Sequence, residues 1–251
     1  MSIGRPFHRN YRGMKNGPNS GFSQWAYITD SSYAESPEKY IRGFQIIQDD
    51  LEKLFQYVEP SNASLDTYSY RIHELLMRCC IEIEANFKAI LSENIYSGEM
   101  HMGIYKKIEK THHLSRYEVS LPIWDGGPRS TKPFDQFAYG AKPEWWNAYN
   151  ASKHNRTSAF NQANFKQLIG AVSALIALLS SQFRTEEFSR ESQALRIDGY
   201  DYYGDGKNPA IGELFRVGFP DDWSEDEVYE FDWDALKDLP DRFQKINYND
   251  I

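Results

Sequence analysis

Residues 144–156 (EWWNAYNASKHNR) form the densest group of side chains in the chain that can bind or react. On a helix, Asn150 and His154 lie four positions apart and therefore share one face, with Lys153 beside them. A histidine exchanges protons near neutral pH, and a lysine or arginine stabilises charge that develops on a phosphate. We interpret His154 as a candidate general acid–base that Asn150 orients, with Lys153 and Arg156 contacting a phosphate ester such as RNA.

The same stretch also fits a structural role. In that interpretation Trp146, Tyr149 and His154 pack inside a helical bundle, and their polar neighbours hydrogen-bond to loop carbonyls or to carboxylates elsewhere. On residue types alone, packing is the commoner role of a single helical histidine. A third interpretation is that Trp145, Trp146 and Tyr149 line a pocket that binds a nucleotide or another small ligand.

A second group of charged side chains lies on a helix predicted at about 65–96. At 100° per residue Arg71, Arg78 and Glu82 fall in one stripe beside the apolar face, with Glu74 near its edge. The spacing allows ion pairs between residues four apart, such as Glu74 with Arg78. We therefore leave two roles open for the stripe: it holds helices together, or its arginines assist His154, Arg78 in catalysis and Arg71 in substrate binding.

Several other kinds of site are not indicated. His112 and His113 are adjacent and point in different directions on any regular element, and no further histidine or cysteine nearby completes a zinc site. Cys79 and Cys80 fall in an apolar-periodic segment and are best interpreted as buried small side chains. The chain has no glycine-rich phosphate loop, G-x-S-x-G or H-E-x-x-H motif. We expect no metal ion and no cofactor.

Hydrophobic periodicity predicts a mainly helical protein, an up-and-down bundle. Ser36 and Pro37 indicate a helix start, Ser36 as the N-cap. The last helix is apolar nearly all round, which predicts that it lies at the centre of the bundle or in a dimer interface. The predicted helices cover 36–58, 65–96, 142–156 and 160–183.

The remaining segments are predicted to be attachments to this bundle. Residues 1–35 form a basic extended arm, and 36–183 form the bundle domain with an insertion at about 103–142. The insertion is a small β-hairpin or ordered loop, with strands at 115–124 and 133–139 around a turn at 125–128. Residues 184–251 form an irregular acidic α+β extension packed on the bundle, with strands at 214–219 and 228–233 and a short helix from 233.

Charge is distributed unevenly along the chain. The net charge is −8, yet residues 1–183 carry 18 acidic and 20 basic side chains, whereas residues 184–251 carry 18 acidic and 8 basic ones. A basic arm favours contact with phosphate and an acidic segment opposes it. The arm therefore either contacts nucleic acid or pairs with the acidic segment, and the acidic segment is a candidate surface for a protein partner.

Length and composition set broad limits. The chain has 251 residues, of which 41% are hydrophobic and 15% aromatic, enough to bury a core. The first residues lack the apolar stretch of a signal peptide, and the apolar run at 168–179 is shorter than a membrane span. We expect a cytoplasmic protein with no membrane association.

The helix RIHELLMRCCIEIEANFKAIL, the later W-x-x-Y-N-x-x-K-H-x-R segment and the apolar helix after it together resemble the HEPN-like helical families. The resemblance covers about residues 40–183. It implies an up-and-down helical bundle, commonly dimeric, of the type found in bacterial toxin–antitoxin, abortive-infection and other phage-defence proteins. Active members are metal-independent ribonucleases in which an arginine and a histidine a few residues later meet the partner's pair across the dimer interface.

The sequence departs from that family pattern at the arginine. His154 keeps the place of the histidine, but Tyr149 stands where the shortest spacing would put the arginine, and Arg156 follows the histidine. The resemblance predicts a homodimer that acts on RNA as a metal-independent ribonuclease, or binds RNA or a nucleotide, in a bacterial defence or toxin system. The alternative is a non-catalytic helical interaction or scaffold protein in which the cluster at 145–156 is structural.

Overall fold

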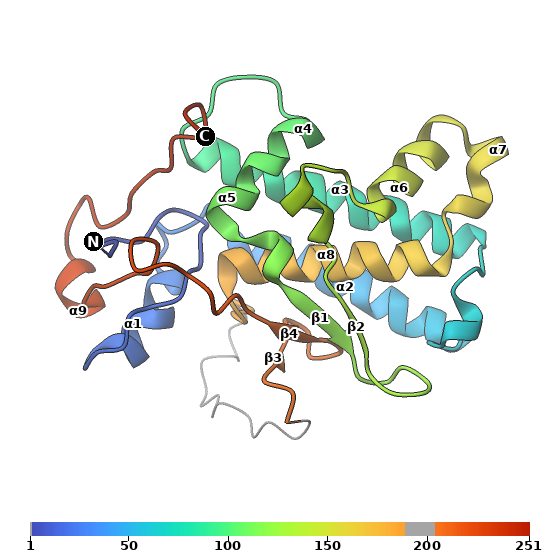
Figure 1. Cartoon of the computed structure of the whole chain (residues 1–251), viewed down its shortest axis with the longest axis horizontal. Helices are drawn as coiled ribbons and strands as arrows, with labels where there is room; N and C mark the ends of the chain where they lie inside the picture. The colour runs from blue at the N-terminus through green and yellow to red at the C-terminus, as the bar shows by residue number, and fades with distance from the viewer. Residues whose placement is uncertain (1, 189–203) are drawn as a thin grey trace.

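The computed structural model describes residues 2–188 and 204–251. The protein is mainly α-helical with a small antiparallel sheet, as the sequence predicted (Figure 1). The helices are α1 (Ser20–Ala26), α2 (Pro37–Phe55), α3 (Tyr70–Glu93), α4 (Met102–Tyr105), α5 (Glu109–His112), α6 (Glu144–His154), α7 (Arg156–Ala159), α8 (Phe165–Phe183) and α9 (Trp233–Leu236). The strands are β1 (Glu118–Leu121), β2 (Arg129–Thr131), β3 (Asn208–Pro209) and β4 (Arg216–Gly218).

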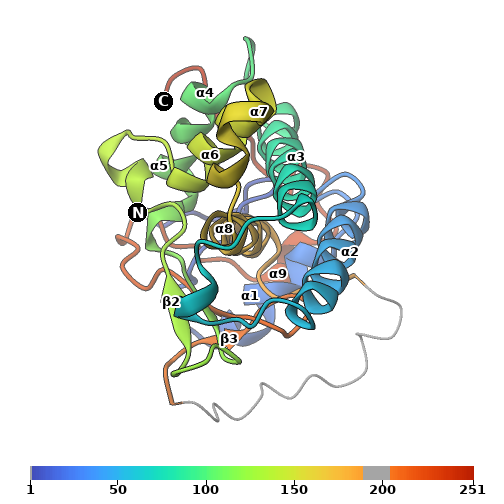
Figure 2. The same ribbon diagram turned by 90° about the vertical axis from the view of Figure 1, so that its right-hand side faces the viewer.

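Four long helices form an up-and-down bundle. Helix α2 runs antiparallel to α3, since Asp50 of α2 pairs with Arg78 while Gly43 of α2 lies against Glu82. Helix α6 packs antiparallel to α3 on another side, and α8 runs parallel to α3 through the middle. Figure 2 shows α8 nearly end-on, with α2, α3 and α6 around it.

Of the two places predicted for the last helix, the structure shows α8 at the centre of the bundle. Every residue from Ala171 to Phe183 is buried, because α3, α6, α2 and strand β1 cover it from different sides. Among the described residues α8 is the one helix long and apolar enough to cross a membrane, but 83% of that stretch is buried inside the protein. Its hydrophobicity is therefore accounted for by its place in the core.

Three predicted helix starts need correction. Helix α8 begins at Phe165 and not at residue 160, because residues 160–162 form a separate 3₁₀ helix. Helix α2 begins at Pro37, but Ser36 adopts a left-handed backbone (φ 49°) and its hydroxyl makes no capping bond. Helix α3 begins at Tyr70, not near residue 65, because Phe165 N–H donates to Thr67 O at 2.8 Å and ties this segment to the start of α8. The Ser69 hydroxyl then caps α3 by accepting from the backbone N–H of Ile72.

The sheet joins the inserted hairpin to the C-terminal segment. Its strand order is β2-β1-β4-β3, all antiparallel. The hairpin was predicted, but its second strand lies at 129–131 directly after the turn, and residues 135–139 form a 3₁₀ helix instead. The strand predicted within 214–219 and the helix from 233 are confirmed; 228–233 is not a strand, since Tyr229 forms only isolated bridges with the N-terminal segment.

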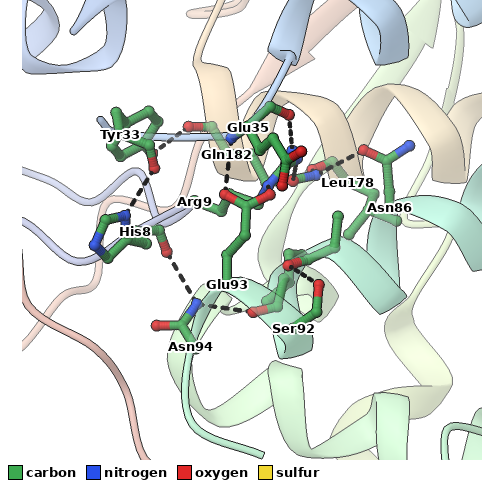
Figure 3. Close-up of polar contacts among 12 residues, drawn as sticks. His8, Arg9, Tyr33, Glu35, Asn86, Ser92, Glu93, Asn94, Leu178 and Gln182 are labelled. Atoms are coloured by element: carbon green, nitrogen blue, oxygen red, sulfur yellow. Dashed lines mark hydrogen bonds and ion pairs between the residues drawn. The ribbon is translucent and has the colours of Figure 1, made fainter. Parts of the chain in front are cut away.

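The N-terminal segment is not the extended basic arm that its composition predicted. It contains α1, and Arg9 is completely buried. The Arg9 guanidinium donates to Glu93 Oε1 at 2.6 Å, to Gln182 Oε1 at 2.9 Å and to the Glu35 carbonyl at 2.8 Å (Figure 3). It also lies 4.5 Å above the Tyr40 ring. Arg9 therefore joins the C-terminal ends of α3 and α8 to the start of α2.

The other basic residues of this segment pair with the acidic C-terminal segment. Arg5 pairs with Asp241, and Lys15 Nζ lies 3.0 Å from Glu230 Oε1. Arg12 donates to Asn10 Oδ1 at 2.9 Å and to the Glu227 carbonyl at 3.2 Å. Of the two roles that the sequence left open for the arm, these contacts match pairing with the acidic segment.

A buried histidine completes the attachment of the N-terminal segment. His112 is fully buried, and its Nε2–H donates to the Arg9 carbonyl at 2.8 Å. The opposite ring nitrogen, Nδ1, lies 3.2 Å from Asn10 Nδ2 and acts as acceptor, so the ring is neutral. Burial lowers the pKa of His112 from 6.5 to about 3.

We predict that Arg9→Gln strongly destabilises the protein. Removing one partner of a buried ion pair leaves the other uncompensated, which costs about 3–5 kcal/mol. Chemical denaturation followed by circular dichroism measures the loss. Arg5→Gln is the matched control, because Arg5 and Asp241 are exposed and such pairs contribute about 0–1 kcal/mol. Equal effects of the two substitutions would contradict the role given to Arg9.

We also predict an acid-dependent loss of stability that requires His112. Above about pH 6.5 the ring is neutral in both the folded and the unfolded chain. Between about pH 6.5 and pH 3 only the unfolded chain binds the proton, because the folded pKa of His112 is about 3. The free energy of unfolding should therefore fall by up to about 1.4 kcal/mol per pH unit in this window. His112→Gln should make the pH dependence of the free energy of unfolding shallower in this window. An unchanged slope would contradict the role given to His112.

Candidate functional site

Helix α6 places one face of the predicted cluster in the core. Trp145, Trp146 and Tyr149 are all buried. The Trp145 indole N–H donates to the Pro133 carbonyl at 2.9 Å, and the Trp146 ring lies 6.0 Å from Trp145 and 5.1 Å from Tyr149. These aromatic side chains pack against the bundle and the inserted segment, so in this structure they belong to the core.

The other face of α6 points outward. His154 is exposed, and its side chain makes no hydrogen bond or ion pair with any described residue. Asn150 shares its face as predicted, but its amide donates to the Trp146 carbonyl of its own helix at 3.1 Å, so it does not orient the imidazole. Arg156 is exposed at the start of α7. The predicted acid–base residue is accessible but has no partner that would fix its tautomer.

A polar network joins α6 to α3 behind this face. The Tyr149 hydroxyl donates to Glu84 Oε1 at 3.1 Å and accepts from Lys153 Nζ at 3.1 Å. Burial raises the pKa of Tyr149, and the hydrogen bond to Tyr149 raises the pKa of Lys153. The phenol is therefore neutral and the amine charged at pH 7, and Lys153 acts mainly as a link between the two helices.

The stripe on α3 faces α2 instead of α6. Arg78 lies 2.6 Å from Asp50 of α2, and Arg71 lies 3.2 Å from Glu74 of its own helix. Arg78 and Glu84 are about 120° apart around α3, and Glu84 is hydrogen-bonded to Tyr149 of α6. Among the described residues no hydrogen bond or ion pair joins Arg71 or Arg78 to α6. Within one chain, Arg71 and Arg78 thus do not lie around His154.

Glu82 of the same stripe explains a glycine in α2. A Cβ atom at Gly43 would lie 2.9 Å from Glu82 Oε2, so a larger residue there would push against the carboxylate. Burial raises the pKa of Glu82, which the nearby Arg78 charge partly offsets. Glu82 therefore serves the close approach of α2 and α3.

Sequence reasoning missed an exposed aromatic group at the end of the bundle. The rings of Tyr68 and Tyr70 lie 5.8 Å and 4.8 Å from the Phe160 ring, and His73 packs on the same ring at 5.5 Å. Tyr68 is 53% exposed and Tyr70 is 71% exposed. We call Tyr68, Tyr70, His73, Arg156 and Phe160 the aromatic tip. In Figure 2 the end of the molecule with α7 and the start of α3 faces the viewer.

Arg156 supplies the positive charge of the aromatic tip. Burial lowers the pKa of His73, and the Arg156 guanidinium lowers it further, so the imidazole is neutral at pH 7. The Nε2 atom of His73 is buried without a hydrogen-bond partner among the described residues. The tip thus offers exposed rings and one guanidinium, and it encloses an unsatisfied ring nitrogen.

The backbone beneath the aromatic tip is firmly held. Tyr68 forms an antiparallel bridge with Asn164, and the Asn164 side chain caps α8 by accepting from the N–H of Gln167. Ser69 caps α3 between the two exposed tyrosines. The signal in the sequence was two tyrosines just outside the apolar period of α3, but their exposure depends on where α7 and Phe160 lie.

Helix α9 of the acidic C-terminal segment lies away from this end. Figure 1 shows α9, with Asp232 and Asp234 at its start, at the opposite end of the long axis from α7. Charged groups in water are screened over about 8 Å at physiological salt. The carboxylates of α9 are therefore screened from the aromatic tip.

Other chemistry is not assembled in the part of the chain that the structure describes. No three His, Cys, Asp or Glu side chains there are grouped as metal ligands would be. Cys79 and Cys80 are buried thiols, as predicted, and burial raises the pKa of both. What remains is a stacking and cation surface at the aromatic tip with the exposed His154 on the adjoining helix.

We predict opposite outcomes for two substitutions within α6. Trp146→Ala should lower the free energy of unfolding by about 3–5 kcal/mol, because a buried aromatic side chain is lost. His154→Ala should change it by no more than about 0.5 kcal/mol, as expected for an exposed side chain without partners. Thermal and denaturant unfolding measure both. A large loss with His154→Ala would show that this histidine has a packing role the structure lacks.

Comparison with known proteins yields no relative. No family model, no curated protein and no solved structure matches the chain. The aromatic tip and the outer face of α6 are therefore interpreted from their own geometry.

Proposed function

We propose that this protein binds single-stranded RNA through the aromatic tip, as an HEPN-like effector of a bacterial defence or toxin system. The observation that carries the proposal is the gathering of the exposed Tyr68 and Tyr70 rings on Phe160, next to the Arg156 guanidinium. Rings that offer open faces beside a cation are the usual means of binding unpaired bases and their backbone.

Single-stranded nucleic acid fits this surface better than a duplex. Each base of a single strand has an exposed π-face, and stacking on an aromatic side chain contributes about 1–3 kcal/mol per base. A duplex hides those faces, and its binding would rely on many cations, whereas Arg156 is the one cation of the tip. The resemblance of residues 40–183 to the HEPN-like families favours RNA over DNA.

Cleavage of RNA is the second candidate. It is favoured by one observation, the exposure of His154 on the face that adjoins the aromatic tip. Arg71 and Arg78 lie on the α2 side of α3, so a cation opposite His154 would come from Arg156 or from a second copy of the chain. A homodimer and a cytoplasmic location stay predictions of the sequence.

A scaffold role is the third candidate and is favoured by the burial of Trp145, Trp146 and Tyr149. It explains the buried face of α6 but gives no role to the exposed rings of the aromatic tip. Solvent-exposed aromatic side chains clustered on one another are more typical of a binding surface than of a bundle surface.

The test is the affinity of purified protein for a fluorescent oligouridylate of about twelve nucleotides, read by anisotropy. Tyr70→Ala should weaken binding about tenfold, since one stacked base loses its platform. The matched control is Tyr139→Ala, because Tyr139 is 84% exposed and lies on the inserted segment. Both variants should unfold at the temperature of the parent protein.

Two results would contradict the proposal. One is the absence of saturable RNA binding by the parent protein, and the other is equal affinity of the two tyrosine variants. Incubation of the RNA with the protein in the presence of a metal chelator tests metal-independent cleavage alongside binding. Shorter products made equally fast by His154→Ala would exclude His154 as acid–base.

A further inference from the structure

A groove of about 650 Å³ lies between α2 and α3. Leu54 and Leu75 give it an apolar part, and Tyr57, which is 85% exposed, stands among the residues that line it. Its charged lining comes from three cations, Lys53, Arg71 and Arg78, and from two carboxylates. A volume of this size is typical of ligand sites.

The groove carries an excess of positive charge. Asp50 is shared by Arg78 at 2.6 Å and Lys53 at 3.1 Å, while Arg71 lies 3.2 Å from Glu74. These pairs are at least one-third exposed, and exposed pairs of this kind contribute only about 0–1 kcal/mol. An incoming phosphate can therefore contact these guanidinium groups at little cost in free energy, because their carboxylate pairs are weak. Each guanidinium can donate two hydrogen bonds to the phosphate, and its carboxylate partner does not prevent this.

The groove and the aromatic tip share the first turn of α3. Arg71, which lines the groove, directly follows Tyr70, whose ring belongs to the tip. From Tyr70 to Arg78 the backbone of α3 rises about 12 Å, the length of about three or four stacked nucleotides. Exposed aromatic rings thus occur in both surfaces, at Tyr70 in the aromatic tip and at Tyr57 among the residues that line the groove.

We infer that the groove between α2 and α3 binds the continuing backbone of the single strand whose bases stack at the aromatic tip. The inference rests on the proposed function and assigns a path: Arg71 and Lys53 take successive phosphates, and Tyr57 offers a second stacking face. The stripe on α3 then has two roles, since Arg78 holds α2 through Asp50 and also borders the strand.

A free mononucleotide presents the same phosphate and base chemistry as a strand, so the experiment must separate the two. The double variant Lys53→Gln/Arg71→Gln removes two exposed cations from the groove and leaves Arg78 with Asp50. The matched control is Arg42→Gln/Lys88→Gln, which removes two exposed cations from the same helices outside the groove. Tyr70→Ala reports on the tip, and uridine monophosphate is the competing mononucleotide.

For the oligouridylate of about twelve nucleotides, the groove variant should bind about tenfold more weakly than the control variant. The slope of log affinity against log salt should fall by about 1.4, because each single-strand phosphate contact contributes about 0.7.

Equal affinity of groove and control variants would overturn the path, while a loss with Tyr70→Ala alone would leave the proposed function standing. The path would also be overturned if equimolar uridine monophosphate displaced the oligonucleotide from the parent protein but not from the groove variant. The groove would then be a mononucleotide pocket. No binding by the parent protein would end both proposals.

Discussion

The buried Arg9 guanidinium is the interaction on which the arrangement of the chain depends. It lies at the C-terminal ends of α3 and α8, where the partial negative charge of each helix favours a cation. Its hydrogen bonds to Glu93, Gln182 and the Glu35 carbonyl satisfy donors that would otherwise be costly to bury. Arg9 also adopts a left-handed backbone (φ 52°), which costs a non-glycine residue about 1–2 kcal/mol. The surrounding contacts must offset that strain, and they do so only when three separate segments meet.

The same interaction decides what the basic N-terminal residues can do. With Arg9 buried, the Arg9 carbonyl accepts from His112 and the next residues follow the acidic C-terminal segment, where Lys15 meets Glu230. The positive charge of residues 5–15 is therefore largely used within the protein. Lys53 of α2, Arg71 of α3 and Arg156 of α7 are exposed cations toward the other end of the bundle. The positive charge concentrated near the N-terminus is thus not available to a ligand. The cations that are available lie in segments with little net positive charge.

The sequence predicts the helices well because their signal is local. The period of α2, α3 and α8 follows from apolar residues within each segment, and the centre of the bundle was one of two places predicted for α8 from its sequence. Features that need distant partners were missed: β4 pairs with β1 across about 100 residues, and Arg9 meets side chains from three elements. A buried arginine cannot be distinguished from an exposed one without those partners, so the arm was predicted to be extended.

The candidate site shows the same division between local and distant information. Helical spacing correctly put Asn150 and His154 on one face, but it could not show that Asn150 bonds its own helix or that α6 contacts α3 at Glu84. Arg71 and Arg78 were rightly grouped, but their direction depends on how α2 and α6 divide the surface of α3. The exposed tyrosines of the aromatic tip have no periodic signal at all.

Helix α3 connects the two surfaces that the proposals use, and its first turn is the most constrained part of that connection. The Tyr68–Asn164 bridge and the Ser69 cap fix the backbone on either side of the exposed rings. A surface that is rigid before binding loses less conformational entropy when a ligand arrives, so more of the stacking energy appears as affinity. Tyr70 and Arg71 both belong to this fixed turn, so the proposed strand would meet both residues on a rigid part of the backbone. The order of the two residues at the helix start thus links the aromatic tip to the groove.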